Sequence, residues 1–280
     1  MTQAPAGVSG GRATGRVSAA FAQAAEQQRA ALVGYLPVGF PSVEGAIEAA
    51  TAMAKSGADI IEIGLPYSDP LIDGPVIQEA VHRALEGGVH VTDVLRTVEA
   101  VAAGGVPVLV MTYWNPVDRY GVIEFARDLA DAGGCGLITP DLPPEEAEPW
   151  LDAAAARGLA PVFLVAPSSC DDRIKLITAA CAGFVYAASV MGITGTRAAV
   201  SSAADVLVER VRQHTALPVA VGLGVSTAAQ AAEVARFADG VIVGSAFVDK
   251  LLRAPDEGAG RIGVSGLAAE LAAGVRRQDG

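Results

Sequence analysis

The sequence predicts an α/β fold, a single (β/α)8 TIM barrel with an additional N-terminal helix and an enlarged loop after strand 2. Three observations predict it. The chain has 280 residues, and one such barrel usually has about 250. Short apolar runs alternate with Ala-rich stretches of helical spacing along the whole chain. No change in composition marks a linker between two domains.

The predicted strands are eight apolar runs rich in Val, Ile or Leu. Continuous runs of this kind are typical of strands buried on both faces, as a parallel sheet requires. They are Ala31–Leu36, Asp59–Ile63, Val106–Met111, Gly136–Thr139, Pro161–Ala166, Gly183–Ala187, Pro218–Val221 and Gly240–Val243. Each run ends near a Gly, Pro or Ser residue, where we expect the chain to turn into a helix.

The stretches between these runs have apolar residues at helical spacing. They are Val43–Ser56, Thr92–Ala103, Val122–Ala132, Glu145–Arg157, Asp172–Ala180, Ala203–Gln213, Thr227–Phe237 and Ala246–Leu252. Several follow a residue that often caps helices, such as Ser42 and Ser226. Eight alternations of strand and helix favour a closed barrel, although a doubly wound open sheet would give the same alternation.

Two segments depart from the regular repeat. The second and third predicted strands are separated by a long stretch of sequence. We therefore expect residues 64–88 to hold a long loop and an extra helix around Ile77–Leu85. The amphipathic segment Val17–Arg29 predicts a helix that closes the bottom of the barrel, or a partly frayed one. We expect residues 1–16, rich in Ala, Gly and Ser, to be a disordered tail, and residues 17–280 to form the single catalytic domain.

Charge and cysteine usage exclude several classes of protein. A net charge of −11 argues against a nucleic-acid partner. No apolar run is long enough to span a membrane. Cys135, Cys170 and Cys181 lack the spacing of a metal site, so we interpret them as buried small side chains in a reducing compartment. We therefore expect a cytoplasmic protein that needs no metal.

Glu62 is the first candidate for catalysis, because it lies inside the apolar run Asp59–Ile63. Active sites of such barrels lie at the C-terminal ends of the strands. If Glu62 faces the barrel interior, burial raises the pKa of its carboxyl and makes it useful as a general acid and base. A structural ion pair is the alternative.

The loop after the same strand carries two more carboxyl groups, Asp69 and Asp73. Neighbouring prolines stiffen this loop, so that it can aim a side chain. Either aspartate could instead be a turn former that bonds its own backbone.

Glycines at the ends of three consecutive strands predict a phosphate site. They lie in Gly192–Gly195, Gly222–Ser226 and Gly244–Ser245. Barrel enzymes often bind phosphate with the loops after the seventh and eighth strands and a helix N-terminus, where backbone N–H groups face the anion. This mode needs no Lys or Arg, in agreement with the acidic chain. Ordinary turn glycines are the alternative.

The stretch Ile61–Gln78, which reads IEIGLPYSDPLIDGPVIQ, resembles the signature segment of tryptophan synthase alpha subunits. Further similar segments are Asn115–Pro116, Pro140–Pro143, Gly192–Gly195, Gly222–Ser226 and Gly244–Ala246. The similarity extends over residues 20–252. It implies a lyase that cleaves indole-3-glycerol phosphate by a retro-aldol reaction to indole and glyceraldehyde 3-phosphate in tryptophan biosynthesis.

The resemblance also implies roles for individual residues. Glu62 is similar to the family's general acid and base, and Asp73 to the residue that holds the indole N–H. Asp69 and its loop match the region that faces the beta subunit. The positions implied for substrate binding are Tyr35, Tyr113, Tyr186, Thr194, Gly195, Gly222, Gly224, Gly244 and Ser245. Thr194 is expected to orient Asp73 when its loop closes.

The implied partner is a pyridoxal-phosphate-dependent beta subunit in an α2β2 heterotetramer, and the chain itself is expected to need no cofactor. The sequence departs from the family at Val190, where many members carry Arg, and in the first-strand segment Gly34–Pro41. Three alternatives stay open. They are a stand-alone lyase that releases free indole, a sugar-phosphate isomerase or epimerase, and a non-catalytic regulatory subunit of the beta chain.

Overall fold

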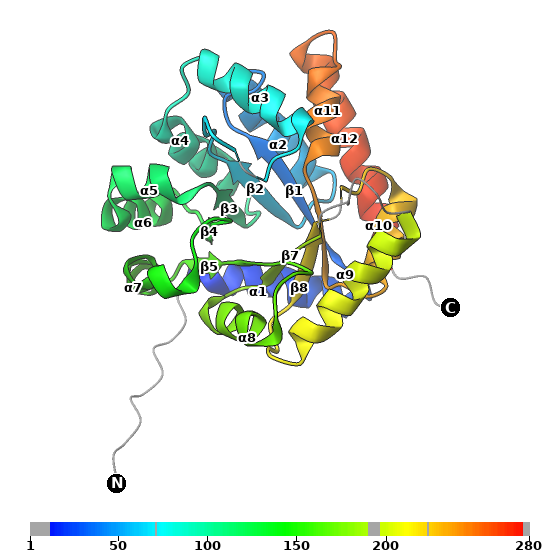
Figure 1. Ribbon diagram of the computed structural model, residues 1–280. Coiled ribbons are helices and arrows are strands. Elements are labelled where there is room, and N and C mark those ends of the chain that lie inside the picture. Colours follow the sequence, from blue (N-terminus) through cyan, green and yellow to red (C-terminus); the bar gives the residue numbers. More distant parts are fainter. Residues whose placement is uncertain (1–11, 71, 190–196, 223, 277–280) are drawn as a thin grey trace.

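The predicted barrel is confirmed by the computed structural model, which describes residues 12–70, 72–189, 197–222 and 224–276 (Figure 1). Its strands form one parallel sheet in the order β5-β4-β3-β2-β1-β9-β8-β7-β6. Their bounds are β1 Ala31–Pro37, β2 Ile60–Gly64, β3 Val108–Met111, β4 Gly136–Ile138, β5 Ala160–Val162, β6 Leu164–Val165, β7 Val185–Ala188, β8 Val219–Gly222 and β9 Gly240–Val243. All but β5 and β6 coincide with predicted runs to within two residues at each end, and β5 and β6 together coincide with one run.

The nine strands occupy eight positions around the barrel. Only Phe163 separates β5 from β6, and the two strands together correspond to the single predicted run Pro161–Ala166, with β5 beginning one residue before it. β5 pairs with β4, and β6 pairs with β7. The Phe163 carbonyl also accepts a hydrogen bond from the Tyr186 amide at 3.3 Å. The divided strand therefore closes the ring between the two ends of the sheet.

Helices surround the sheet (Figure 1). Their bounds are α1 Arg12–Glu26, α2 Val43–Lys55, α3 Pro75–Glu86, α4 Val91–Ala102, α5 Trp114–Tyr120, α6 Val122–Asp131, α7 Glu148–Arg157, α8 Asp171–Ala180, α9 Arg197–Arg212, α10 Ala228–Ala235, α11 Ser245–Leu252 and α12 Glu257–Gly274, with a 3-10 turn at Pro144–Glu146. The predicted extra helix after β2 is α3. None of these helices, within the residues described, is long and apolar enough to cross a bilayer.

Capping was predicted correctly at one helix and wrongly at another. The Ser42 hydroxyl accepts a hydrogen bond from the Gly45 amide and caps α2. At α10 the cap is Thr227, not Ser226, because Thr227 and Gln230 form a reciprocal capping box.

Burial of the cysteines was predicted only in part, since Cys170 is exposed at the start of α8.

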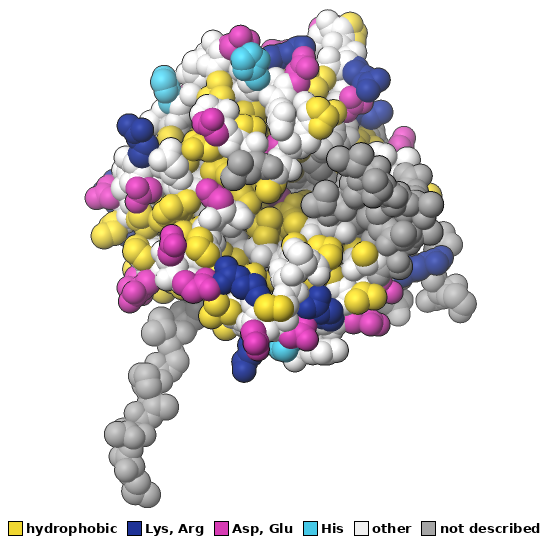
Figure 2. Space-filling model, viewed as in Figure 1, with side chains coloured by type: hydrophobic (Ala, Val, Ile, Leu, Met, Phe, Trp, Pro, Cys, Tyr) yellow, Lys and Arg dark blue, Asp and Glu magenta, His cyan; other side chains and the backbone are white. Residues whose placement is uncertain are grey.

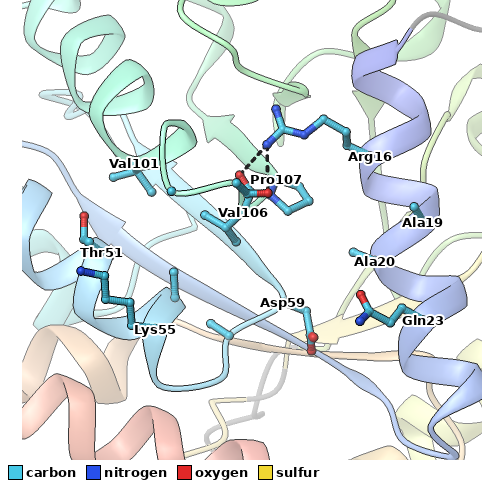
Figure 3. Close-up of a pocket in the computed structure, with 14 residues that line it drawn as sticks. Arg16, Ala19, Ala20, Gln23, Thr51, Lys55, Asp59, Val101, Val106 and Pro107 are labelled. Carbon is cyan, nitrogen blue, oxygen red and sulfur yellow. Dashed lines mark hydrogen bonds between the residues drawn. The ribbon is translucent and has the colours of Figure 1, made fainter.

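α1 closes the bottom of the barrel, as predicted, but begins at Arg12, five residues earlier than expected. Val17, Phe21 and Ala24 are buried against the inward-facing side chains at the lower ends of the strands. The Arg16 guanidinium, at the top of Figure 3, donates to the carbonyls of Val106 at 2.9 Å, Gly105 at 3.2 Å and Gly133 at 3.3 Å. These bonds tie α1 to the loops that lead into β3 and β4.

Candidate active site

A cavity of about 260 Å³ lies at the C-terminal ends of the strands, where barrel enzymes have their active sites. It is bounded by residues of seven strands, β1, β2, β3, β6, β7, β8 and β9, and by the loop after β2. The lining residues are Tyr35, Glu62, Ile72, Asp73, Gly74, Ile77, Met111, Leu164, Tyr186, Ala188, Ser189, Gly222, Gly224, Ile242, Gly244 and Ser245. Eight of the predicted site residues therefore surround one space.

Glu62 faces the barrel interior. It lies between Tyr35 on β1 and Leu109 on β3 in the sheet register and is 1% exposed. Its Oε2 atom is buried and has no hydrogen-bond partner among the residues described, and no ion pair with Glu62 occurs there either. Burial, and then the nearby Asp73 carboxylate, raises the pKa of Glu62 to about 8. Glu62 is therefore protonated at neutral pH and can donate a proton into the cavity.

Asp73 is half-buried, and hydrogen bonds of its loop hold it at the cavity rim. The Tyr113 hydroxyl accepts from the Ile72 amide at 3.0 Å and lies 3.5 Å from Asp73 Oδ2. Gln78 Nε2 donates to the Asp73 carbonyl at 2.7 Å. Burial raises the pKa of Asp73, and the hydrogen bond from Tyr113 lowers it. The other aspartate of this loop, Asp69, does not line the cavity; it accepts from the Ser68 hydroxyl.

Two tyrosines form walls of the cavity because glycines make room for them. A Cβ atom on Gly64 would lie 2.3 Å from the Tyr35 hydroxyl, and one on Gly222 would lie 2.8 Å from the Tyr186 hydroxyl. Burial raises the pKa of both tyrosines further above its usual value, and the carboxyl groups of Glu62 and Asp73 add to this effect. Both hydroxyls therefore stay protonated and can donate hydrogen bonds.

One end of the cavity has the character of an anion site. Gly222, Gly224 and Gly244 line it, and Ser245 begins α11. Gly224 has φ +65°, a conformation that a side chain would disfavour. No Lys or Arg lines the described part of this cavity. Backbone N–H groups and the helix dipole therefore provide the positive potential there.

Three predicted positions cannot be placed in this cavity. Thr194, Gly195 and Val190 lie outside the described residues. Tyr113 is described but borders the cavity indirectly, through its contact with Asp73.

Sequence reasoning missed several residues of the cavity. They are Ile72, Gly74, Ile77, Met111, Leu164, Ala188, Ser189 and Ile242. Strand register could have found some of them, since Met111 pairs with Gly64, Leu164 with Tyr186, and Ile242 with Gly222. An inward-facing partner of a site residue lies on the same layer of the barrel.

A second cavity, of about 470 Å³, lies at the opposite end of the barrel between α1, α2 and α4 (Figure 3). Two of its charged groups, Arg16 and Asp59, have protein partners. Arg16 is bonded to backbone carbonyls, as described above. Asp59 accepts from the Arg29 guanidinium and the Leu32 amide. Because this end of a barrel stabilises the fold rather than binds substrate, we assign the active site to the C-terminal end.

Metal and nucleic-acid sites find no support in the part of the chain that the structure describes. No group of three or more His, Cys, Asp or Glu side chains is placed there to hold a metal ion. On the face seen in Figure 2, Lys and Arg are dispersed among Asp and Glu and form no continuous basic patch. The polar groups that line the cavity are carboxyl groups, hydroxyls and backbone groups.

Comparison with known proteins gives a consistent result. The family described as "Tryptophan synthase alpha chain" matches residues 21–270. The tryptophan synthase alpha chain of Streptomyces coelicolor is 62% identical over 259 residues, which are 92% of this chain and 96% of that protein. The corresponding protein of Salinispora tropica is 60% identical over 93% of this chain and 98% of its own length.

Solved structures agree. A tryptophan synthase from M. tuberculosis in space group F222 has a TM-score of 0.88 at 53% identity and covers 94% of this chain and 99% of its own. An aminoacrylate-bound form from the same organism has a TM-score of 0.86 at 51% identity, with 93% and 99% coverage.

Proposed function

The chain belongs to the tryptophan synthase alpha chain family, and we propose that Glu62 and Asp73 carry out its reaction, the cleavage of indole-3-glycerol phosphate to indole and glyceraldehyde 3-phosphate. The family match covers residues 21–270, and the relatives cover more than nine-tenths of the chain. The observation that carries the assignment of the two residues is a buried carboxyl, with its pKa raised to about 8, in the same cavity as a second carboxyl.

The reaction is a retro-aldol cleavage, and its difficulty is the leaving group. Indole leaves poorly while its ring is aromatic, so a proton is first added to C3 of the ring. Protonated Glu62 can donate it. The hydroxyl of the side chain then loses its proton to the Glu62 carboxylate or a water, an aldehyde forms, and the electrons of the broken carbon–carbon bond restore the indole.

Asp73 supports the charged intermediate. Positive charge builds at the ring nitrogen when C3 is protonated, and an ionised carboxylate beside that nitrogen stabilises it. Two carboxyl groups with different environments can serve as acid and anion at the same pH. The hydrogen bond from Tyr113 favours the ionised form of Asp73, while burial favours the protonated form of Glu62.

The remaining residues position the substrate. We assign the phosphate group to Gly222, Gly224, Gly244 and Ser245, with Gly195 by resemblance, and the indole ring to the space between Tyr35, Tyr186 and the apolar wall. Thr194 and Tyr113 are assigned to the orientation of Asp73. Positioning of this kind contributes to rate because the reacting groups are already aligned.

The proposed partner is a tryptophan synthase beta chain in an α2β2 complex. Relatives of this chain are crystallised as tryptophan synthase, one of them in an aminoacrylate-bound form. The pyridoxal phosphate of the complex lies in the beta chain, so this chain's own residues carry the lyase reaction. We further propose that residues 17–280 act as one catalytic domain and that the protein works in the cytoplasm, where its three unpaired cysteines are stable.

The aspartates of one loop provide a test of this assignment. The variant Asp73→Asn keeps the shape of the side chain and removes its charge, so we expect cleavage of indole-3-glycerol phosphate to fall about 10²–10³-fold. Asp69→Asn, an exposed position on the same loop, is the matched control in assays of the isolated chain. Equal activity of the two variants would remove Asp73 from the mechanism.

A further inference from the structure

A third, much smaller cavity is lined in part by Asp73. It has a volume of about 20 Å³ and is lined by Tyr35, Leu65, Tyr67, Asp73, Val81, Met111, Thr112, Tyr113 and Pro140. A space of about 10–15 Å³ is enough for one water molecule, provided that polar groups surround it. Asp73, Thr112 and three tyrosines supply such groups here. The rings of two of these tyrosines, Tyr67 and Tyr113, pack with their centroids 5.1 Å apart.

Thr112 is the unexplained member of this group. It follows β3 directly, its side chain is 2% exposed, and its Oγ1 atom has no hydrogen-bond partner among the residues described. Its backbone is fixed, because the Thr112 amide donates to the Ile138 carbonyl at 3.1 Å. A buried hydroxyl without a partner is costly, so a native protein usually satisfies it with a water if no side chain is available.

Asp73, which lines the same small cavity, needs hydrogen-bond donors for its carboxylate. Its proposed role requires the ionised form, yet burial raises its pKa. The titratable groups that face it are Glu62 from β2, Tyr35 from β1, Tyr113 after β3 and Tyr186 from β7. Only Tyr113 has a described hydrogen bond to its carboxylate, and that bond is long at 3.5 Å. A further donor would hold the carboxylate ionised and fix its direction.

Building on the proposed function, we propose that one water molecule in this cavity bonds to Thr112 and donates to Asp73, which makes Thr112 a positioning residue for the lyase reaction. Thr112 touches no substrate in this arrangement. It acts through Asp73, whose orientation toward the indole nitrogen and whose ionised state depend on the water. The same water satisfies the buried Thr112 hydroxyl.

Thr112→Val tests the proposal, because valine has the shape of threonine and lacks the hydroxyl. We expect the acid limb of the pH dependence of kcat/KM to move to higher pH by about one unit, the effect of losing one hydrogen bond to a charged group. Activity at the pH of the original limb then falls on the order of tenfold. Thr112→Ser keeps the hydroxyl and is expected to restore the limb.

Thr139 provides a matched control. It follows β4, is 1% exposed, and its Oγ1 atom also has no partner among the described residues, but it does not line this cavity. Thr139→Val is expected to leave the acid limb in place. The proposal is overturned if Thr112→Val leaves the limb unmoved, or if both valine variants shift it equally. Should Thr112→Val fail to fold, Thr112→Ala offers the same comparison.

The two proposals can fail separately. If Glu62→Gln and Asp73→Asn lose activity but the acid limb of Thr112→Val does not move, only the proposed role of Thr112 is contradicted. Activity that survives both carboxyl variants contradicts the proposed mechanism itself.

Discussion

Glu62 and Asp73 divide two tasks because their surroundings differ. Glu62 lies on a strand with apolar neighbours on both sides and is shielded from water, so the neutral form is favoured. Asp73 lies on a loop, is partly accessible and accepts a hydrogen bond from Tyr113. In the proposed mechanism, Glu62 donates the proton and Asp73 holds the positive charge.

This division predicts the pH dependence of the reaction. As the pH rises through about 8, Glu62 loses the proton that it donates, and kcat/KM falls. As the pH falls through the pKa of Asp73, the charge beside the ring nitrogen is lost, and kcat/KM falls again. In Asp73→Asn the repulsion on Glu62 is removed, so its pKa drops and the alkaline limb moves to lower pH. An alkaline limb at the same pH in both proteins would contradict this coupling.

The same carboxyl reduces stability at high pH. The pKa of Glu62 is about 8 in the folded chain and 4.5 is the ordinary value, so protonated Glu62 fits the fold better than ionised Glu62. Its contribution to the free energy of unfolding is fully present below pH 4.5 and is lost as the pH rises through 8. We expect Glu62→Gln to be more stable than the wild type in urea unfolding at pH 9 and nearly equal at pH 4. If the two proteins had equal free energies of unfolding at pH 9 as well as at pH 4, the fold would not raise the pKa of Glu62.

At the scale of elements, strand register brings the site together. Tyr35 lies beside Glu62, and Tyr186 lies beside Leu164 on one side and Ala220 on the other. Glycines at the strand ends leave room for the two tyrosine hydroxyls. The cavity therefore depends on residues without side chains as much as on the polar groups that surround it.

Close strand packing gives a prediction at this scale. A Cβ atom on Gly136 in β4 would lie 2.1 Å from the Ala160 carbonyl oxygen of β5, which is backbone and cannot yield easily. We expect Gly136→Ala to lower the free energy of unfolding by about 2 kcal/mol. Gly266→Ala, on α12 with nothing near its Cβ position, is the control and is expected to raise it by about 0.5–1 kcal/mol. Urea unfolding of both variants measures the difference, and similar values would contradict this account.

Most elements could be predicted from the sequence because apolar runs and helical spacing are local signals. Helices α5 and α12 were missed. α5 begins immediately after β3, where both Asp141 carboxylate oxygens accept from the Trp114 amide, a contact between distant residues. α12 contains Gly260, Gly263 and Gly266, which weaken the helical pattern. It is stabilised by packing against α2, α10 and α11, which a single segment does not reveal.

The residues of the candidate site, like the elements, could be predicted from the sequence only in part. Glu62 stands out because a carboxyl in an apolar strand is unusual, and the glycines stand out because they end consecutive strands. The roles of Asp73, Tyr35 and Tyr186 followed only from resemblance. The loop pattern singled out Asp69 and Asp73 equally and assigned a task to neither. Thr112 and Met111 were missed because their importance arises from which strands become neighbours.

The whole molecule is acidic, with a net charge of −11, yet its substrate carries a phosphate. The proposed phosphate site at Gly222, Gly224, Gly244 and Ser245 would resolve this conflict, because the positive potential of backbone groups acts only at short range. The cavity opens at the end of the barrel where the loops after the strands lie. A partner that covers this end would exclude water and strengthen the electrostatic interactions inside.

We therefore expect cleavage by the isolated chain to be slow and to rise when a tryptophan synthase beta chain is added. Release of glyceraldehyde 3-phosphate measures it, with an unrelated pyridoxal phosphate enzyme as the control. Fast turnover that does not change with the partner would instead indicate a stand-alone lyase that releases free indole.

The most direct test of the central claim is the release of glyceraldehyde 3-phosphate by Glu62→Gln in the presence of the beta chain. Glutamine keeps the size of the side chain and cannot donate the proton, so we expect the rate to fall about 10²–10⁴-fold while the variant still folds and binds its partner. The control is Glu86→Gln, an exposed position at the end of α3, which is expected to keep the wild-type rate. Cleavage by Glu62→Gln at the wild-type rate would contradict the assignment of Glu62 as the general acid and leave the protein as a barrel whose proton donor lies elsewhere.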